Sequence, residues 1–238
     1  MWNKLYKNKK LDVWLDISTY CNAACPQCHR TSPRTADKAD WLPLIQWSLD
    51  QFKSAFPIQS MIHIHRFQLC GTWGDPIMNR DVYSIIEYIV KYSNCKVVLN
   101  TNGSLRDPLW WWQLGFLLGD RGSCYFCIDG SDQEMHERYR QKTDLSLVLE
   151  NMEAFSEFSK SSGFTIVFKH NENYLKDIYD LAKKYGAEDH CFIPSDRAHH
   201  HDTFKYMDPE GNLKFLEHSP KYGRQPQRAS FKVEDIND

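Results

Sequence analysis

Residues 12–30 read DVWLDISTYCNAACPQCHR and join a strand-like run to a loop with three cysteines, Cys21, Cys25 and Cys28. Apolar, β-branched and aromatic residues in 12–18 favour a strand. Asn22 and Pro26 favour a loop for the residues that follow. Three thiols are one fewer than a structural zinc site needs and one more than a redox dithiol needs. The sequence therefore places an incomplete set of sulfur ligands directly after the first strand.

Four interpretations of this loop remain open from the residues alone. On a helix, positions 21, 25 and 28 would form one face, and the cysteines would be small buried residues. A zinc site would need His29 or His63 as its fourth ligand. A dithiol formed by CPQC would leave Cys21 unused. A [4Fe–4S] cluster held by three thiolates would leave one iron open for a small molecule, and Arg30 and Arg34 would favour the thiolate form.

The bulk composition limits the class of protein. A chain of 238 residues fits one large domain, and 42% hydrophobic residues suffice for a core. A formal net charge of −2 gives no strong nucleic-acid signal and no general attraction to an anionic membrane. We see neither a signal peptide nor an apolar run of the ~20 residues that a membrane span needs. We therefore expect a cytoplasmic protein without a membrane partner, in which clustered cysteines bind metal or react.

Strand-like and helix-like segments alternate along most of the chain. Strands are expected near residues 12–18, 60–71, 96–103, 124–131, 164–170 and 190–194, and helices over 41–56, 80–93, 107–118, 145–160 and 174–185. This alternation predicts an α/β fold, a partial (β/α)6 TIM-type barrel with parallel strands. Residues 1–195 would form the partial barrel, and residues 196–238 an irregular C-terminal extension. In the helix after residue 107, Trp110, Trp111 and Trp112 cannot all face the core.

Three further polar motifs fall at the expected carboxyl ends of strands. They are GTWGDP at residues 71–76, NTNG at 100–103 and IDGS at 128–131. In barrels of this kind the active site lies at the carboxyl ends of the strands. The motifs and the cysteine loop are therefore expected to meet at one edge of the sheet.

The cysteine loop and these motifs together resemble the radical S-adenosylmethionine (SAM) superfamily. CNAACPQC matches the family's CxxxCxxC signature after the first strand, GTWGDP resembles its GGEP-type motif, and NTNG resembles its third-strand motif. IDGSDQEMHERYR, at residues 128–140, resembles the fourth strand of the peptide- and protein-modifying branch. The resemblance extends over residues 11–194. No cysteine follows Cys191, so we expect one cluster only and no cysteine-rich auxiliary-cluster domain.

The resemblance implies two cofactors, a [4Fe–4S] cluster and S-adenosyl-L-methionine, with Cys21, Cys25 and Cys28 as the metal ligands. The implied SAM-binding residues are Gly71, Thr72, Gly74, Asp75, Asn100, Cys127 and Arg140. The amino group of SAM would be received by the turn at residues 71–75 through carbonyls and the Asp75 carboxylate. Three positions depart from the family pattern: Gln27 replaces an aromatic residue, Asp75 a glutamate and Cys127 a serine.

The resemblance also implies an activity. The chain would cleave SAM reductively to a 5′-deoxyadenosyl radical, which abstracts hydrogen from an organic substrate. The fourth-strand segment favours a peptide or protein substrate, and the alternatives are a small metabolite or nucleotide, or a non-catalytic iron–sulfur or zinc-binding partner protein. An electron donor such as flavodoxin or ferredoxin would be a partner. The sequence itself assigns no further catalytic side chain.

Overall fold

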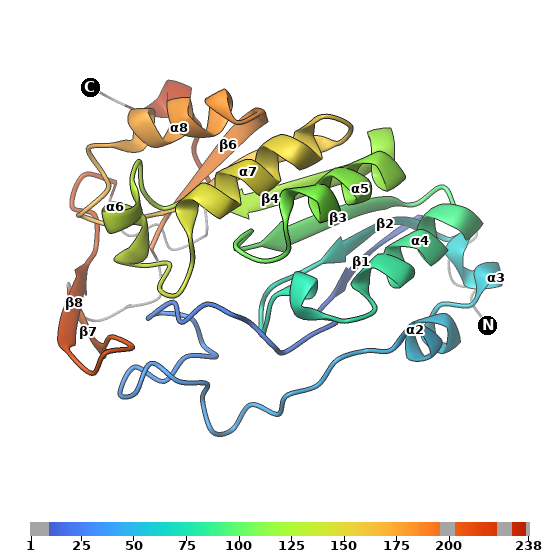
Figure 1. Ribbon diagram of the computed structural model, residues 1–238, viewed down its shortest axis with the longest axis horizontal. Helices are drawn as coiled ribbons and strands as arrows, with labels where there is room; N and C mark the ends of the chain where they lie inside the picture. Colours follow the sequence, from blue (N-terminus) through green and yellow to red (C-terminus); the bar gives the residue numbers. More distant parts are fainter. Residues whose placement is uncertain (1–9, 196–202, 223–229, 237–238) are drawn as a thin grey trace.

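Six parallel strands form the central sheet, in the sequential order β1 to β6 (Figure 1). The computed structural model describes residues 10–195, 203–222 and 230–236. The strands are β1 (Leu11–Leu15), β2 (Ile64–Leu69), β3 (Lys96–Thr101), β4 (Gly122–Cys127), β5 (Lys160–Val167) and β6 (Ala187–Pro194). Parallel neighbours require a crossover between each pair, which the helices supply. The predicted α/β partial barrel is confirmed.

The helices cover one face of this sheet. They are α2 (Leu49–Ala55), α3 (Ile58–Met61), α4 (Val82–Tyr92), α5 (Pro108–Leu118), α6 (Gln133–Glu137), α7 (Leu145–Ser156) and α8 (Leu175–Lys184), with 3-10 turns η1 (Pro76–Met78), η2 (Gly119–Arg121) and η3 (Val233–Asp235). Figure 1 shows α4, α5, α7 and α8 lying along the same side of the strands. Within the described ranges, none of the helices combines the length and the apolar character that a membrane crossing requires.

The two faces of the sheet differ in character. Phe67, Leu99 and Phe126 are fully buried and belong to the main core with the helices. Along β4 and β5 the intervening residues, including Tyr125, Cys127 and Phe164, are only half-buried. Because side chains alternate between the faces of a strand, these residues lie on the face away from the helices. That open face is called the concave face below.

Local capping explains where two of the helices begin. Ser48 and Gln51 form a capping box, so α2 begins at Leu49 and the helix expected over residues 41–56 is shorter than predicted. The side chain of Asp107 accepts a hydrogen bond from the Trp110 amide, and Pro108 occupies the first turn of α5. The predicted start of the helix after residue 107 is confirmed.

The start of β5 shows tertiary packing overriding local preference. The strand begins at Lys160, earlier than expected, and includes Ser161, Ser162 and Gly163. A Cβ at Gly163 would lie 2.1 Å from Nδ1 of His190 on the neighbouring strand β6. Only glycine at position 163 leaves room for the His190 ring. Packing against β6 therefore requires glycine here, although glycine is rare in strands.

The C-terminal extension is more ordered than predicted. Its strands β7 (Thr203–Met207) and β8 (Leu213–Glu217) pair antiparallel and form a hairpin. The hairpin is tied to the barrel because the Met207 amide donates to Pro33 O at 2.8 Å and the Lys169 amide to Glu217 O at 3.1 Å. The expectation of an irregular tail is therefore wrong for this hairpin, whose short strands with half-exposed residues gave little periodic signal.

The tryptophans of α5 offer a test of the packing. Trp111 is fully buried and packs on Phe126, with ring centroids 4.9 Å apart, whereas Trp112 is 37% exposed. We expect Trp111→Ala to lower the free energy of unfolding by about 3–5 kcal/mol through the cavity that it leaves. Trp112→Ala is the matched control, with an expected loss of about 1 kcal/mol or less. Urea unfolding followed by circular dichroism measures both, and equal losses would contradict this packing.

Candidate functional site

The cysteine loop lies directly after β1 and is packed among apolar side chains. Cys25 is 7% exposed, and Cys21 and Cys28 pack against the same small cluster. The other buried members of the cluster are Ala23, Tyr139, Phe168, Tyr206 and Leu216. All three cysteines are free thiols. Two of the residues that enclose them, Tyr206 and Leu216, come from the C-terminal hairpin.

Two arginines adjoin the loop. Arg30 is buried, and its guanidinium donates to Thr19 O at 3.4 Å and Ala23 O at 3.5 Å. Nη1 of Arg140 lies 3.8 Å from Sγ of Cys25. Arg34, which the sequence also placed near the thiols, is exposed. The positive charge beside the sulfur atoms therefore comes from Arg30 and Arg140.

Burial favours the protonated form of the Cys21 and Cys25 thiols. Desolvation raises the pKa of Cys25 to about 11, although the Arg140 charge opposes it, and it raises the pKa of Cys21 still further. A metal takes thiolate and not thiol as its ligand, so metal binding at this loop must release protons. The loop therefore combines a low dielectric with two fixed cations that favour negative sulfur.

The donor set fits an iron–sulfur cluster better than a single metal ion. The ligands of one zinc must converge within about 2.3 Å of one point. Among the described residues, no three His, Cys, Asp or Glu side chains converge in that way. A cubane binds each thiolate to a different iron, so its three sulfurs do not need to converge. Three thiols on one loop, in which Cys25 interacts electrostatically with both Cys21 and Cys28, match that requirement.

The turn at residues 71–76 docks against the start of the cysteine loop. The Asp75 amide donates to Tyr20 O at 2.7 Å. A Cβ at Gly74 would lie 2.3 Å from Ser18 O, so this close approach of two backbones requires glycine. The carboxylate of Asp16, after β1, accepts from the amides of Thr72 at 2.8 Å and Trp73 at 3.3 Å. The second-strand motif is therefore fixed to the cysteine loop through its main chain.

The Asp75 carboxylate is fully occupied by groups of the protein. It is 3% exposed and accepts from the Ile77 amide at 3.0 Å and the Thr101 hydroxyl at 2.9 Å. The backbone amide of Asn102 and its side-chain Nδ2 also donate to this carboxylate, at 2.8 Å and 2.7 Å. Burial raises the pKa of the Asp75 carboxyl, and these hydrogen bonds oppose that shift. The carboxylate joins the ends of β2 and β3, and its acceptor positions are already in use.

Asn102 is a site residue that the sequence reasoning missed. Its Nδ2 lies 3.7 Å from Sγ of Cys21 and 2.9 Å from Oδ1 of Asn22, in addition to its bond with Asp75. Its own Oδ1 accepts from the Ser104 amide at 2.9 Å. The NTNG motif carried the signal, but the sequence could not say which of its two asparagines turned toward the cysteines.

The other asparagine, Asn100, has a different neighbour. Its Oδ1 accepts a short hydrogen bond from Nε2 of Gln68 on β2. Cys127, at the end of β4, is half-buried and interacts electrostatically with Arg140 and Cys25. Burial raises the pKa of the Cys127 thiol to about 12, so it is neutral. The structure thus brings Cys127 to the cysteine loop and leaves Asn100 one strand away from it, beside Gln68.

Arg140 takes part in a buried ion pair. Its Nε donates a short hydrogen bond to Asp129, whose side chain is fully buried, while the Arg140 side chain is 11% exposed. Burial acts to lower the pKa of Arg140, but the facing carboxylate outweighs it and holds that pKa well above the ordinary value. The Asp129 carboxylate also accepts from the Ile166 amide at 2.6 Å. The fourth-strand motif therefore places the positively charged Arg140 guanidinium beside the Cys25 sulfur.

A buried histidine holds this ion pair in place. Nδ1 of His136 accepts from the Asp129 amide at 3.2 Å, and its Nε2 lies 3.0 Å from Oγ1 of Thr143. The Thr143 hydroxyl donates its proton to Arg140 O, so Nε2 must donate to Thr143. His136 is therefore neutral with its proton on Nε2. Sequence reasoning did not single it out, because a histidine in a short helix gives no pattern.

Gln27, which departs from the family pattern, has a structural partner. It is 7% exposed, and its Oε1 accepts from the Ser195 hydroxyl at 2.7 Å. Ser195 follows the last residue of β6. The side chain therefore links the cysteine loop to the far edge of the sheet.

Breaking the buried ion pair should be costly. Asp129→Asn leaves the Arg140 guanidinium buried without a full counter-charge, and we expect a loss of about 3–5 kcal/mol in the free energy of unfolding. Asp180→Asn is the control, because the Lys176–Asp180 pair at 2.7 Å has a 55% exposed carboxylate and an expected worth of about 0–1 kcal/mol. Urea unfolding of both variants decides the point, and a small loss for Asp129→Asn would show that the pair is dispensable.

The buried His136 should make stability depend on pH. Desolvation lowers its pKa from 6.5 to about 3, so between these values the unfolded chain binds a proton that the folded chain does not. Stability is therefore lost as pH falls below 6.5. The advantage of wild type over His136→Gln should shrink by about 2 kcal/mol between pH 7 and pH 5. Urea unfolding at both pH values measures it; an unchanged gap would mean that His136 binds its proton as readily in the folded chain as in the unfolded one.

Known proteins resemble this chain in sequence. No protein-family model matches it. An AdoMet-dependent heme synthase of Oleidesulfovibrio alaskensis is 28% identical over 199 residues, which cover 79% of this chain and 47% of that protein. The AdoMet-dependent heme synthase of Nitratidesulfovibrio vulgaris is 26% identical over 203 residues, 79% of this chain and 50% of that protein. The chain thus spans about half the length of the curated relatives it matches.

Solved structures share the fold. Streptococcus suis SuiB bound to its precursor peptide SuiA matches with a TM-score of 0.61 and 11% identity, over 80% of this chain and 41% of SuiB. The enzyme anSMEcpe with bound AdoMet matches with a TM-score of 0.60 and 18% identity, over 77% of this chain and 50% of that chain. Together with the cysteine loop and the three strand-end motifs, these similarities show that the chain resembles the radical SAM proteins in sequence and in fold.

Proposed function

We propose that the chain is a radical SAM enzyme in which Cys21, Cys25 and Cys28 hold a [4Fe–4S] cluster. When bound, the cluster supplies one electron that cleaves SAM to methionine and a 5′-deoxyadenosyl radical, which takes a hydrogen atom from an organic substrate. The observation that carries the proposal is the packing of three free thiols on one loop beside the Arg140 guanidinium, at the carboxyl end of β1. An electron donor of the flavodoxin or ferredoxin type would serve as partner.

The turn at residues 71–75 is assigned to the SAM amino group through its main chain. An ammonium donates hydrogen bonds and accepts none, so it needs free acceptors. The Asp75 carboxylate is saturated by Ile77, Thr101 and Asn102, so the acceptors are backbone carbonyls of residues 71–74. Gly71 and Gly74 allow this close approach, and Asp75 shapes the turn. We therefore assign Asp75 an indirect role: its carboxylate shapes the turn and does not contact the SAM amino group itself.

Arg140 is assigned mainly to the thiolates. Its Nε is used by Asp129 and its Nη1 faces Cys25, so the guanidinium stabilises negative charge on sulfur. A contact with the SAM carboxylate is the alternative for its remaining N–H groups. Asn100 and Cys127 are assigned to the SAM side of the strand ends, where an amide and a half-buried thiol offer polar contacts.

The substrate is assigned to the concave face of the sheet. Tyr125, Phe164 and Ile166 are half-buried there, and such aromatic and aliphatic side chains suit an organic molecule. Both curated relatives are named heme synthases, which favours a small molecule. SuiB and anSMEcpe were each solved with a peptide, and their shared fold keeps a peptide substrate as the alternative.

Anaerobic reconstitution tests the proposal. Wild type should bind about four irons and four sulfides per chain and, after reduction, release 5′-deoxyadenosine from SAM. The variant with Cys21, Cys25 and Cys28 changed to Ala should lose the iron, the EPR signal of the reduced cluster and 5′-deoxyadenosine together. Cys95→Ala is the matched control, since Cys95 is buried beside the Ile64 carbonyl and away from the loop. One tightly bound zinc and no 5′-deoxyadenosine would support a non-catalytic metal-binding protein instead.

A further inference from the structure

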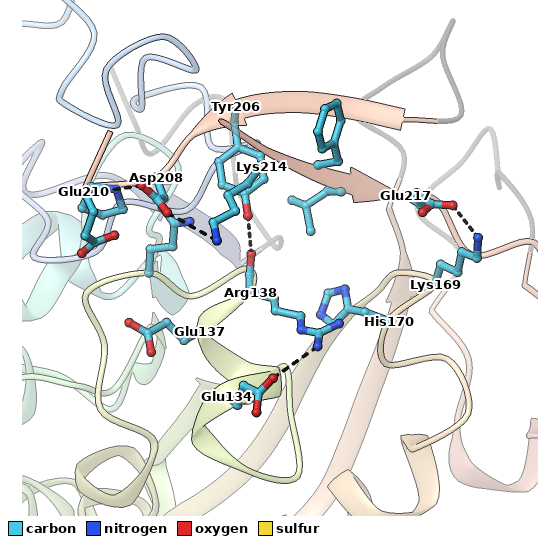
Figure 2. Close-up of a pocket in the computed structure, with 14 residues that line it drawn as sticks. Glu134, Glu137, Arg138, Lys169, His170, Tyr206, Asp208, Glu210, Lys214 and Glu217 are labelled. Atoms are coloured by element: carbon cyan, nitrogen blue, oxygen red, sulfur yellow. Dashed lines mark hydrogen bonds and ion pairs between the residues drawn. The ribbon is translucent and has the colours of Figure 1, made fainter. Parts of the chain in front are cut away.

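A second cavity lies behind the cysteine loop, between α6, the residues after β5 and the C-terminal hairpin (Figure 2). Its volume is about 710 Å³. Tyr206 and Leu216 line it with one side and pack in the apolar cluster of Cys25 with the other. The cavity is therefore separated from the thiols by a layer of side chains, and neither the SAM assignments nor the concave face use it.

The charges around the cavity do not balance. The lining holds five carboxylates and three basic side chains. Each base already has an acidic partner: Arg138–Glu134 at 3.4 Å, Lys169–Glu217 at 2.5 Å and Lys214–Asp208 at 3.8 Å. Within the described part of the chain, this leaves Glu137 and Glu210 without a basic partner, and Glu137 accepts a hydrogen bond of 3.5 Å from Nε2 of the neutral Gln133 side chain. The excess charge is negative.

Exposed acidic residues alone are most often only a solvated surface, but a buried acceptor in the same wall points to a ligand. Gln141 is 5% exposed and lines the cavity, and its Oε1 has no hydrogen-bond partner. The orientation of its amide follows from Tyr206. The Tyr206 hydroxyl gives its single proton to Arg138 O at 3.2 Å, so Gln141 must meet this hydroxyl with its NH2 group. The free atom is therefore the oxygen, a pure acceptor.

His170 adds a second unpaired atom. Its Nε2 is buried without a partner, and its ring stacks on Phe168 with centroids 5.6 Å apart. Desolvation, and then the Arg138 charge, lower its pKa to about 4, so the ring is neutral at pH 7 and one of its nitrogens accepts. Buried polar atoms without partners are rare in folded proteins, and a bound water, ion or ligand is their ordinary explanation.

We propose that this cavity binds a cationic hydrogen-bond donor, an alkylammonium or guanidinium group. Gln141 Oε1 would accept its N–H groups, and Glu137 and Glu210 would neutralise its charge. A donor of this kind matches the Gln141 oxygen that lacks a partner as well as the sign of the unpaired charge. The group can belong to a free amine or to a lysine or arginine side chain of a peptide. The proposal does not depend on the radical chemistry.

The position of Gln141 would couple such a ligand to the cysteine loop. The Gln141 carbonyl accepts from the Ala24 amide at 3.0 Å, and Ala24 lies between two of the cysteines. A ligand held by the Gln141 side chain is thus one residue away from the loop.

Isothermal titration calorimetry of the reconstituted protein under anaerobic conditions tests the proposal, with three probes. Agmatine represents a free amine, a capped lysine-rich hexapeptide represents a peptide side chain, and N-butylacetamide is the uncharged control. We expect saturable binding of agmatine, the peptide or both, and none of N-butylacetamide. The Glu137→Gln/Glu210→Gln double variant and Gln141→Ala should each weaken binding by about tenfold, as the loss of a charged partner does.

The control variant is Glu188→Gln, whose carboxylate is 57% exposed, pairs with Lys160 and lies outside the cavity; its affinities should equal those of wild type. Binding of agmatine alone identifies a free amine as the ligand, and binding of the hexapeptide alone identifies a peptide. The proposal is overturned if neither probe binds at about 10 mM, the weak limit of useful affinity. It is also overturned if the double glutamate variant, which changes only exposed positions, binds as wild type does.

Discussion

The buried carboxylate of Asp75 is the constraint on which the site depends. It accepts hydrogen bonds from η1 on one side and from Thr101 and Asn102 at the end of β3 on the other. Asn102, fixed in this way, reaches Cys21 and Asn22 in the cysteine loop. One carboxylate thus sets the relative positions of three strand ends. A neutral side chain of the same size would leave several buried donors unpaired, at about 1–3 kcal/mol each.

The residues that depart from the family pattern make specific contacts in the fold. Gln27 stands where an aromatic residue is usual, and its amide oxygen takes the Ser195 hydroxyl as partner, so the loop is linked to β6 by a hydrogen bond instead of an aromatic contact. Asp75, shorter than glutamate by one methylene, is short enough to bond the Ile77 amide in its own turn. Cys127 sits within the field of Arg140. These changes alter how the site is supported and keep its cysteines in place.

Much of the architecture could be predicted because its signals are local. Alternating strand and helix periods gave the parallel sheet, and the motifs at residues 71–76, 100–103 and 128–131 are confirmed at the carboxyl ends of β2, β3 and β4. The remaining features depend on distant partners. Three of them each follow from a contact that no sequence window contains: the choice of Asn102 over Asn100, the support of Asp129 by His136, and the presence of Gly163 within β5. The hairpin was missed because half-exposed strands give weak periodicity.

The hairpin also shows why the cysteine loop cannot be understood from its own residues. Tyr206 and Leu216 are 181 and 191 positions from Cys25, yet they help to bury it, and burial raises the pKa of its thiol to about 11. A loop exposed to water would release its protons more easily but would hold a cluster in a medium of high dielectric, where Arg140 and Arg30 act weakly. Burial reverses both conditions: deprotonation becomes difficult, and each fixed cation acts more strongly on the thiolates that form. Metal binding and proton release must then occur together, so loading becomes more favourable as pH rises.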